Sequence, residues 1–171
     1  MSARVTAADV YRRHPEQSEI DEVLAGRGVA ALGTLNDDGS IHLTYLLFLY
    51  EDGRFLLETA SSTRKARNVA ARGTASLLVQ GQASSGRSLM VSCEGSARII
   101  SLPEAQEANH RLRAKYLVED AVAAIDAAWG AFDDVSIEVV PERWHSWTGD
   151  EFARTTQESI GRDYEEIWKP D

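Results

Sequence analysis

The stretch that decides the fold runs from Arg54 to Val79 and reads Arg-Phe-Leu-Leu-Glu-Thr-Ala-Ser-Ser-Thr-Arg-Lys-Ala-Arg-Asn-Val-Ala-Ala-Arg-Gly-Thr-Ala-Ser-Leu-Leu-Val. Its first residues are apolar and favour a strand. A turn rich in hydroxyl side chains follows, and then a short basic segment with helical spacing of its apolar residues. The stretch ends in a second apolar strand. It therefore predicts a strand, a turn, a basic helix and another strand in that order.

The turn combines hydroxyl side chains with two cations at the point where the helix begins. Its hydroxyl residues are Thr59, Ser61, Ser62 and Thr63, and Arg64 and Lys65 follow them directly. A helix N-terminus has unpaired backbone N–H groups and a partial positive charge, so it favours an anion. Hydroxyl donors and cations strengthen that preference for a phosphate in particular. The turn is therefore a candidate phosphate site.

The helix after the turn is expected to have a buried face and a basic outer face. The residues expected to face the protein are Ala66, Val69, Ala70 and Gly73. Those expected on the outer face are Lys65, Asn68 and Arg72, with Arg64 beside them. This spacing follows from the helical repeat. The same pattern is also typical of an amphipathic helix whose basic side is only solvated.

The composition limits the classes of protein to consider. The chain has 171 residues, 43% of them hydrophobic, and a net charge of −9 with a pI near 4.9. This length predicts one domain, spanning residues 1–171, with a sizeable core. The acidic balance argues against nucleic acid as the main partner, because binding a phosphate backbone needs a broad basic surface. A basic cluster on this background favours a local anion site.

The sequence contains none of the common motifs of catalytic side chains. Its four histidines lack the spacing of metal ligands, and no nucleophile elbow, P-loop or dinucleotide-binding glycine motif is present. The single cysteine, Cys93, lies in an apolar alternating run, which favours an inert core thiol over a nucleophile. We therefore expect no metal site, and we expect any difficult chemistry to come from a cofactor.

Two further absences favour a cytoplasmic protein. No apolar run approaches the roughly 20 residues of a membrane span, and the N-terminus lacks the pattern of a signal peptide. We therefore expect no membrane partner and a cytoplasmic location.

Along the chain, short antiparallel strands alternate with tight turns and are flanked by helices. The first 26 residues are predicted to be helical, with a second helix that opens at Pro15 and ends near Gly26. The predicted strands are Val29–Leu35, Ile41–Tyr50, Phe55–Thr59, Thr74–Gln80, Ser88–Ile100 broken at Gly95, Val135–Val140 and Arg143–Trp147. A helical insertion is predicted at about residues 102–130. Its first helix should begin with a capping box at Ser101–Glu104, and its second should span Ala121–Trp129.

This order predicts a mainly β fold with helices (α+β), in the form of a small antiparallel barrel. Short turns between successive strands indicate a meander, unlike the crossovers of parallel sheets. Strand Ile41–Tyr50 is apolar nearly throughout, so both of its faces should be covered. A packed barrel interior on one side and a second subunit or helix on the other would cover them.

The order of elements and three motifs resemble the split-barrel flavoproteins of the pyridoxamine-phosphate-oxidase-like family. In the oxidase itself the turn carries a threonine and then Ser-Arg-Lys, all in contact with the FMN phosphate; Thr59 and Thr63–Lys65 stand at the same spacing here. Val91–Gly95 is similar to that family's strand ending in Glu-Gly. Pro141–Gly149 is similar to its late strand, whose tryptophan lies by the flavin. The resemblance covers roughly Val29–Ile100 and Val135–Gly149.

The chain departs from the true oxidase at three places. The oxidase's long second strand carries an arginine and a lysine that reach the phosphate, whereas His42–Phe48 has neither. Met90 and Ser92 stand where the oxidase has glutamine and arginine, and the C-terminal Arg-x-His that holds its vitamin substrate is absent. The chain therefore resembles the broader group of flavin- or deazaflavin-dependent oxidoreductases on this barrel. The run Lys65–Asn68 (Lys-x-Arg-Asn) is a recurrent feature of that group.

The resemblance implies an FMN-binding split barrel that acts as a homodimeric oxidoreductase. FMN would lie in a groove between subunits, with Arg64 and Lys65 neutralising its phosphate. The remaining implied cofactor-binding residues are Thr59, Ser61, Ser62 and Thr63 around the phosphate, and Thr44 and Trp147 around the flavin ring. Trp147 is equally explained as a core or interface aromatic. Catalysis would be hydride or electron transfer to an unknown small molecule, with no acid or base assigned to the protein.

Two alternatives remain open. The first is a deazaflavin coenzyme in the same groove; the cations are mostly arginine, which hints at a GC-rich genome, and such organisms often make that coenzyme. The second is a binding or storage protein that holds a flavin or a haem without turnover.

Overall fold

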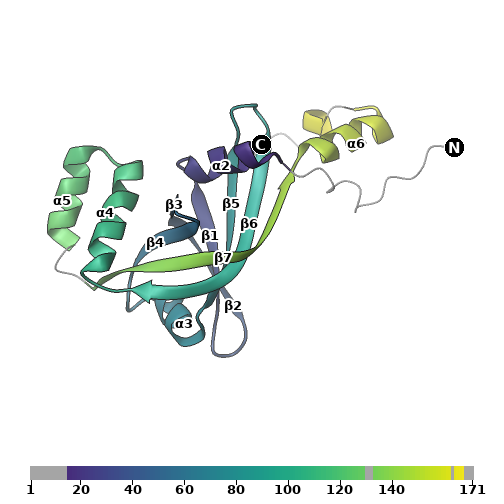
Figure 1. Ribbon diagram of the computed structural model, residues 1–171. Helices are drawn as coiled ribbons and strands as arrows, with labels where there is room; N and C mark the ends of the chain where they lie inside the picture. The colour runs from purple at the N-terminus through teal and green to yellow at the C-terminus, as the bar shows by residue number, and fades with distance from the viewer. Residues whose placement is uncertain (1–14, 130–132, 163, 168–171) are drawn as a thin grey trace.

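The computed structural model describes residues 15–129, 133–162 and 164–167 and consists of a curled sheet with helices around it (Figure 1). The elements are α2 (Gln17–Ala25), β1 (Val29–Leu35), β2 (Ile41–Leu47), β3 (Leu49–Glu51), β4 (Arg54–Ala60), α3 (Arg64–Arg72), β5 (Thr74–Gln82), β6 (Ser88–Ile100), α4 (Glu104–Tyr116), α5 (Glu119–Trp129), β7 (Asp134–Thr148), α6 (Asp150–Ile160) and the 3₁₀ turn η1 (Tyr164–Ile167). The predicted second helix and the strand–turn–helix–strand stretch are confirmed. The helix predicted before Pro15 lies outside the described residues.

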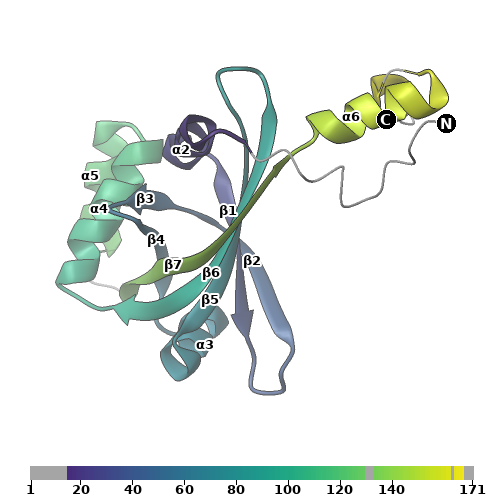
Figure 2. The same ribbon diagram turned by 45° about the vertical axis from the view of Figure 1, so that its right-hand side comes forward.

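The seven strands form one antiparallel sheet in the order β2-β1-β5-β6-β7-β4-β3. Its two edge strands, β2 and β3, are neighbours in the chain and are separated only by Phe48. The sheet must therefore curl until its edges meet, as Figure 2 shows from the side of β1 and β2. This confirms the predicted antiparallel split barrel.

The predicted single strand Ile41–Tyr50 is wrong, because the chain breaks at Phe48. This side chain is fully buried, and its backbone is held by α4 instead of by a neighbouring strand. Its carbonyl accepts hydrogen bonds from the Tyr116 hydroxyl at 2.9 Å and the Lys115 ammonium at 3.2 Å. The Tyr116 hydroxyl also donates to the carbonyl of Gly28. The end of α4 thus closes the seam of the barrel, a long-range contact that no local pattern in the sequence indicates.

The barrel interior holds the main hydrophobic core. Alternate residues of β1 and β5 are buried, as the period of two in strands requires. On β4 and the first part of β7 successive residues are buried, because α4 packs on these strands from outside. The largest side chains there are Leu32, Phe48, Phe55, Leu57 and Ile137, all at most 1% exposed. Cys93 also lies in this core, and burial raises the pKa of its thiol to about 12. The prediction of an inert core cysteine is therefore confirmed.

The long strands β6 and β7 bend together at Gly95. Their pairing shifts register between Glu94 and Gly95, which faces Pro141. A Cβ atom on Gly95 would lie 2.0 Å from the Val140 carbonyl oxygen, so only glycine fits. The predicted break at Gly95 is confirmed as this irregularity. The predicted separate strands Val135–Val140 and Arg143–Trp147 are wrong, because β7 continues through Pro141 as one strand.

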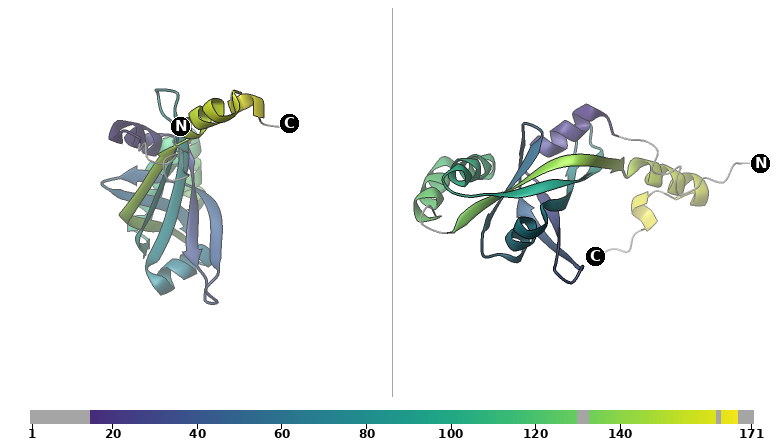
Figure 3. Two further views of the ribbon diagram at one scale, coloured as in Figure 1. Left: turned by 90° about the vertical axis from the view of Figure 1, so that its right-hand side faces the viewer. Right: turned by 60° about the horizontal axis from the view of Figure 1, so that its bottom comes forward.

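The helical insertion packs at one end of the barrel, and α6 lies at the other end, beyond β7 (Figure 3). α4 lies on β4 and β7, where the Asn109 side chain accepts a hydrogen bond from Ser136 at 2.9 Å. The capping box predicted at Ser101–Glu104 is wrong: the helix begins at Glu104 after Pro103, with no side-chain cap. The backbone closes this turn instead, since the Ala105 N–H donates to the Ser101 carbonyl.

One face of the barrel exposes an apolar surface. On β2, Ile41, Leu43 and Tyr45 are 61%, 69% and 75% exposed, while His42 and Thr44 point the other way. Val29 of β1 and Leu78 of β5 extend this surface across the neighbouring strands. Both faces of this strand were predicted to be covered. The described residues of the chain cover only the inner face and leave the outer face exposed. None of the helices in these residues is long and apolar enough to cross a membrane.

Candidate functional site

The hydroxyl-rich turn is built around the N-terminus of α3. Thr63 is the N-cap residue, and its hydroxyl oxygen accepts a hydrogen bond from the Ala66 N–H at 3.4 Å. The same hydroxyl donates to the carbonyl of Ala60 at 2.8 Å. The helix ends at Gly73, which adopts the left-handed conformation common at that position. The turn is therefore held in a defined shape by its own side chain.

Most hydroxyl groups of the turn already have partners within the chain. The Thr59 and Thr63 side-chain oxygens lie 3.1 Å apart; because Thr63 donates to Ala60, Thr59 is the donor. Ser61 donates to the Asp133 carboxylate, and its N–H donates to the Asp133 carbonyl at 3.2 Å. Ser62 is exposed, and its hydroxyl has no partner among the described residues. Of the four hydroxyls, that of Ser62 is thus available to a ligand.

The two cations at the helix start have no ion-pair partner among the described residues. Neither Arg64 nor Lys65 makes a hydrogen bond or ion pair with any residue of the described ranges through its side chain. Lys65 is half-buried, and that burial lowers the pKa of its ammonium. Arg64 is exposed and lies near Asp38, whose pKa is lowered chiefly by hydrogen bonds from Ser40 and in small part by Arg64.

The faces of α3 differ in part from the prediction. Ala66 and Val69 are buried as expected, but Ala70 is exposed. Asn68, expected on the outer face, is buried, and its amide donates to the side chains of Thr34 at 3.1 Å and Asn36 at 2.9 Å. The helix is therefore rotated so that a polar side chain anchors it to β1.

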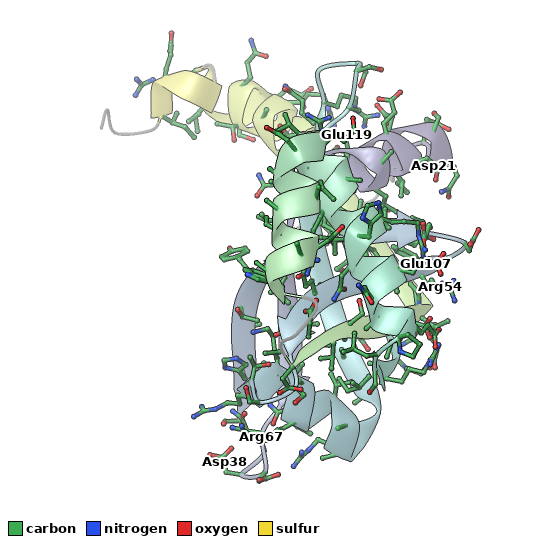
Figure 4. The ribbon with its side chains drawn as sticks, turned by 90° about the vertical axis from the view of Figure 1, so that its left-hand side faces the viewer. Asp21, Asp38, Arg54, Arg67, Glu107 and Glu119 are labelled. Carbon is green, nitrogen blue, oxygen red and sulfur yellow. The ribbon has the colours of Figure 1, made fainter. Side chains whose placement is uncertain are left out.

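Two further cations of α3, Arg72 of the predicted outer face and Arg67, have partners within the chain. Arg72 pairs with Asp37 at 2.8 Å. Arg67 donates to the carbonyl of Ser62 within the turn. Figure 4 labels Arg67 and Asp38 at the end of the molecule that holds α3. Among the described residues of α3, the side chains of Arg64 and Lys65 are therefore available to bind an anion.

The two residues predicted around the flavin ring lie at different distances from the turn. Thr44 is half-buried on the inner side of β2 and pairs with Leu32 of β1, two residues before the Thr34 that α3 contacts. Trp147 is half-buried near the end of β7, whereas the turn lies beside the start of β7, where Ala60 pairs with Asp134. β7 has 15 residues. At 3.3 Å per residue it follows a path of roughly 50 Å. Trp147 of the same chain and the turn therefore lie near opposite ends of β7.

A cavity of about 710 Å³ opens beside the turn and extends under α4 and α5. It is lined by Leu46, Leu47, Glu58, Thr59, Ala60, Leu112, Arg113, Leu117, Ile125, Trp129, Asp133 and Asp134. This volume is within the range of small-molecule sites. Thr59 and Ala60 belong to both the turn and the cavity lining, so the cavity borders the turn that holds the candidate phosphate site.

One arginine and three carboxylates form the polar part of this region. Arg113, with its side chain 5% exposed, donates to Glu58 at 3.0 and 3.1 Å, to Asp126 at 2.6 Å and to Asp134 at 2.8 Å. Burial raises the pKa of Glu58, although Arg113 acts to lower it. Burial acts to raise the pKa of Asp126 too, but His110 and Arg113 hold it below its usual value.

No single local pattern in the sequence indicates this polar cluster. Glu58 could have been recognised from the sequence as a candidate, because it is a charged residue that directly follows three apolar residues of a predicted strand. Arg113 lies next to Leu112 of the buried stripe of α4, which was a weaker signal. Asp134 gives none, since an acidic residue before a strand is usually solvated.

One family model matches most of the chain. A family model described as pyridoxamine 5'-phosphate oxidase matches residues 17–148. No curated protein matches the chain. Among solved structures, a conserved hypothetical protein from Mycobacterium tuberculosis has a TM-score of 0.65 at 26% identity, over 81% of this chain and 88% of the other.

Two further solved structures are similar to the chain and carry cofactor names. An F420 reductase has a TM-score of 0.55 at 22% identity, over 77% of this chain and 98% of the other. An FAD-binding protein from Mesorhizobium loti has a TM-score of 0.56 at 16% identity, over 80% and 96%. At these identities the two show the shared fold. With the family match over most of its length and the curled seven-stranded sheet, the chain belongs to the pyridoxamine 5'-phosphate oxidase family of split-barrel proteins.

Proposed function

We propose that this protein is an oxidoreductase that holds FMN in a groove between two subunits, with the phosphate at the N-terminus of α3. The observation that carries the proposal is the half-buried ammonium of Lys65, which has no anionic partner in the described part of the chain. Burying a cation without a partner is costly, and a phosphate would offset that cost. The backbone N–H groups of Arg64 and Lys65 are also unpaired there.

The residues of the turn fit a phosphate in distinct roles. Lys65 and Arg64 would neutralise its charge, and Ser62 and the first N–H groups of α3 would donate hydrogen bonds. Thr59, Ser61 and Thr63 would support the turn, since their hydroxyl hydrogens are already used within the chain. Thr44 would lie beside the flavin ring. Bound flavin supplies hydride or electron transfer, so no acid or base is assigned to the protein.

Removing both cations should abolish the contribution of the phosphate to cofactor affinity. Charge-assisted bonds to a phosphate are worth about 1.5–3 kcal/mol each, or roughly ten- to a hundredfold in affinity. The double variant Arg64→Ala/Lys65→Ala is therefore expected to bind FMN at least about a hundredfold more weakly. Riboflavin lacks the phosphate, so its affinity should be unchanged. Calorimetric titration of apo-protein with both compounds measures this difference.

Arg72→Ala provides the matched control for that titration. It removes a cation from the same helix, but from the opposite end, where Arg72 already pairs with Asp37. FMN affinity should stay within about twofold of wild type. Equal loss of FMN and riboflavin affinity in the double variant, or no loss of either, would rule out the phosphate site.

The second subunit in this proposal is supported by the exposed surface of β2. Its apolar side chains at Ile41, Leu43 and Tyr45 form a contiguous patch with Val29 and Leu78, and such patches mark interfaces. A two-fold axis would bring the same patch of each chain together and create two equivalent grooves. It would also allow Trp147 of one chain to reach the turn of the other.

A negative charge on this surface should prevent assembly. We expect wild type to show a mass of about twice the 18.8 kDa of the chain in light scattering at micromolar concentration. Tyr45→Glu should be a monomer, because the charge would be buried without a partner. Gln106→Glu, on the exposed side of α4, adds the same charge elsewhere and should remain dimeric. A monomeric wild type would refute the shared groove.

The absorption spectrum of the purified protein decides between FMN and the other cofactors. A flavin, a deazaflavin and a haem have different spectra, and the F420 reductase among the structural relatives makes the deazaflavin the main alternative. A bound flavin or haem without turnover would indicate a binding or storage role. We further propose that the protein is not a true pyridoxamine phosphate oxidase, because Met90 and Ser92 replace that enzyme's polar pair.

A further inference from the structure

The cavity is larger than the phosphate site requires, and most of it lies under the helical insertion. Only Thr59 and Ala60 of its lining belong to the hydroxyl-rich turn. The remaining walls come from β2, from α4 and α5, and from the chain leading into β7. On the basis of the proposed function, this second part is the space left for a substrate.

The walls of this part are apolar and come from facing elements. β2 contributes Leu46 and Leu47, α4 contributes Leu112, and α5 contributes Ile125 and Trp129. α5 lies on the outer side of α4, away from the barrel (Figure 1). A large aromatic side chain, Trp129, is 47% exposed at this wall although it lines a cavity. Such a lining favours a ring compound of low polarity.

The charges of the lining disfavour anions. Glu58, Asp133 and Asp134 are carboxylates, and Arg113 is the one cation of the described lining. All three nitrogens of its guanidinium already donate to carboxylates. A second anion near this cluster would face repulsion without a free cationic partner. This differs from the start of α3, where both cations are unpaired within the described ranges.

We propose that the part of the cavity under α4 and α5 binds the substrate of this oxidoreductase, an uncharged and largely apolar ring compound, and rejects anionic analogues. The substrate class follows from the apolar walls and the excess of carboxylates. Leu117 and Asp133 determine specificity in this site: Leu117 by filling space at the end of α4, and Asp133 by its charge at the exposed rim.

Two dyes that differ by one sulfonate test this proposal. N-phenyl-1-naphthylamine is uncharged, and 8-anilino-1-naphthalenesulfonate carries a negative charge on almost the same ring system. Equilibrium dialysis of each dye against the full-length protein gives both affinities without turnover. We expect the uncharged dye to bind at least about tenfold more tightly than the sulfonate. Equal affinities, or tighter binding of the sulfonate, would overturn the proposal.

Two variants test whether the dyes bind in this cavity. Leu117→Trp enlarges a side chain that is 37% exposed, and it should weaken binding of the uncharged dye at least about tenfold. Asp133→Asn removes a charge at nearly constant volume, so the affinity for the sulfonate should rise toward that for the uncharged dye. It does not change the core and is informative even if Leu117→Trp is poorly folded. Unchanged dye binding in folded Leu117→Trp, or an unchanged sulfonate affinity in Asp133→Asn, would overturn the proposal.

Saturation with FMN separates this inference from the proposed function. The uncharged dye should still bind the FMN-loaded protein, because the proposal places the substrate part of the cavity apart from both the phosphate site and the flavin ring beside Thr44, which does not line the cavity. Displacement of the dye by FMN would assign the whole cavity to the cofactor and overturn the inference, while the proposed function would stand. Binding of the dye by a protein that does not distinguish FMN from riboflavin would instead retain the apolar site and remove the proposed cofactor.

Discussion

Gly95→Ala is expected to destabilise the protein by at least about 3 kcal/mol, a large part of the total stability of a typical domain. The added Cβ would lie 2.0 Å from the Val140 carbonyl oxygen and 2.9 Å from its carbon. Both neighbours are backbone atoms, so no side chain can move aside. The two central strands would have to separate at their bend. Urea unfolding followed by circular dichroism measures the change.

Gly149→Ala is the control for this variant. Gly149 follows β7 and has an ordinary negative φ, and an added Cβ would meet open space, with no atom within 4 Å. Its replacement should change the unfolding free energy by less than about 0.5 kcal/mol. A Gly95→Ala protein as stable as this control would show that the bend between β6 and β7 does not depend on the close approach of the two strands.

Arg113→Met is expected to cost about 3–5 kcal/mol at pH 8, which is typical when one partner of a buried ion pair is removed. Methionine fills much of the same volume, so the loss is mainly electrostatic. Three carboxylates, Glu58, Asp126 and Asp134, would remain close together without their shared cation. Urea unfolding gives the free energy, and the wild type provides the reference at each pH.

This cost should shrink in acid. Burial raises the pKa of Glu58 above its ordinary value, so the folded protein holds this proton more tightly than the unfolded chain does. The contribution of Glu58 to stability is therefore greatest at low pH and falls as pH rises through its folded pKa. Arg113 acts to lower the pKa of Glu58 and of Asp126, so its loss should raise both pKa values. The difference between variant and wild type should be small near about pH 4 and full near about pH 8.

Arg111→Met is the matched control on the same helix. Arg111 is partly exposed and pairs with Glu51 at 2.8 Å and Glu107 at 2.9 Å. Ion pairs of this kind contribute up to about 1 kcal/mol. A loss at Arg113 no larger than that at Arg111, or independent of pH, would contradict the role assigned to the buried cluster.

The sequence predicts the fold well where the pattern is local. The strand, turn, basic helix and strand of Arg54–Val79 are all present, because apolar alternation, a threonine N-cap and a glycine at the helix end each act within a few residues. The irregularity at Gly95 is also indicated locally, by a glycine inside a strand of alternating apolar and polar residues. These patterns act between residues that are close in the sequence, so they depend little on the rest of the fold.

The failures come from contacts between distant segments. The break at Phe48 depends on Tyr116 and Lys115, which lie in another element. Asn68 was expected on the surface because it is polar, yet Thr34 and Asn36 satisfy its amide inside the protein. In the candidate site, the turn was foreseen, but Arg113 and its carboxylates come from separate segments and meet only in the folded chain.

The position of β7 in the sheet has a consequence for how the chain assembles. β7 is the last strand of the sheet in the sequence, yet it lies between β6 and β4. Until it is present, β2-β1-β5-β6 and β4-β3 have no strand that joins them into one sheet. During synthesis, the barrel therefore cannot close until β7, the last of the seven strands in the sequence, has been made. Such non-local pairing is slow to form, and the unpaired edges of β6 and β4 remain open to other chains meanwhile.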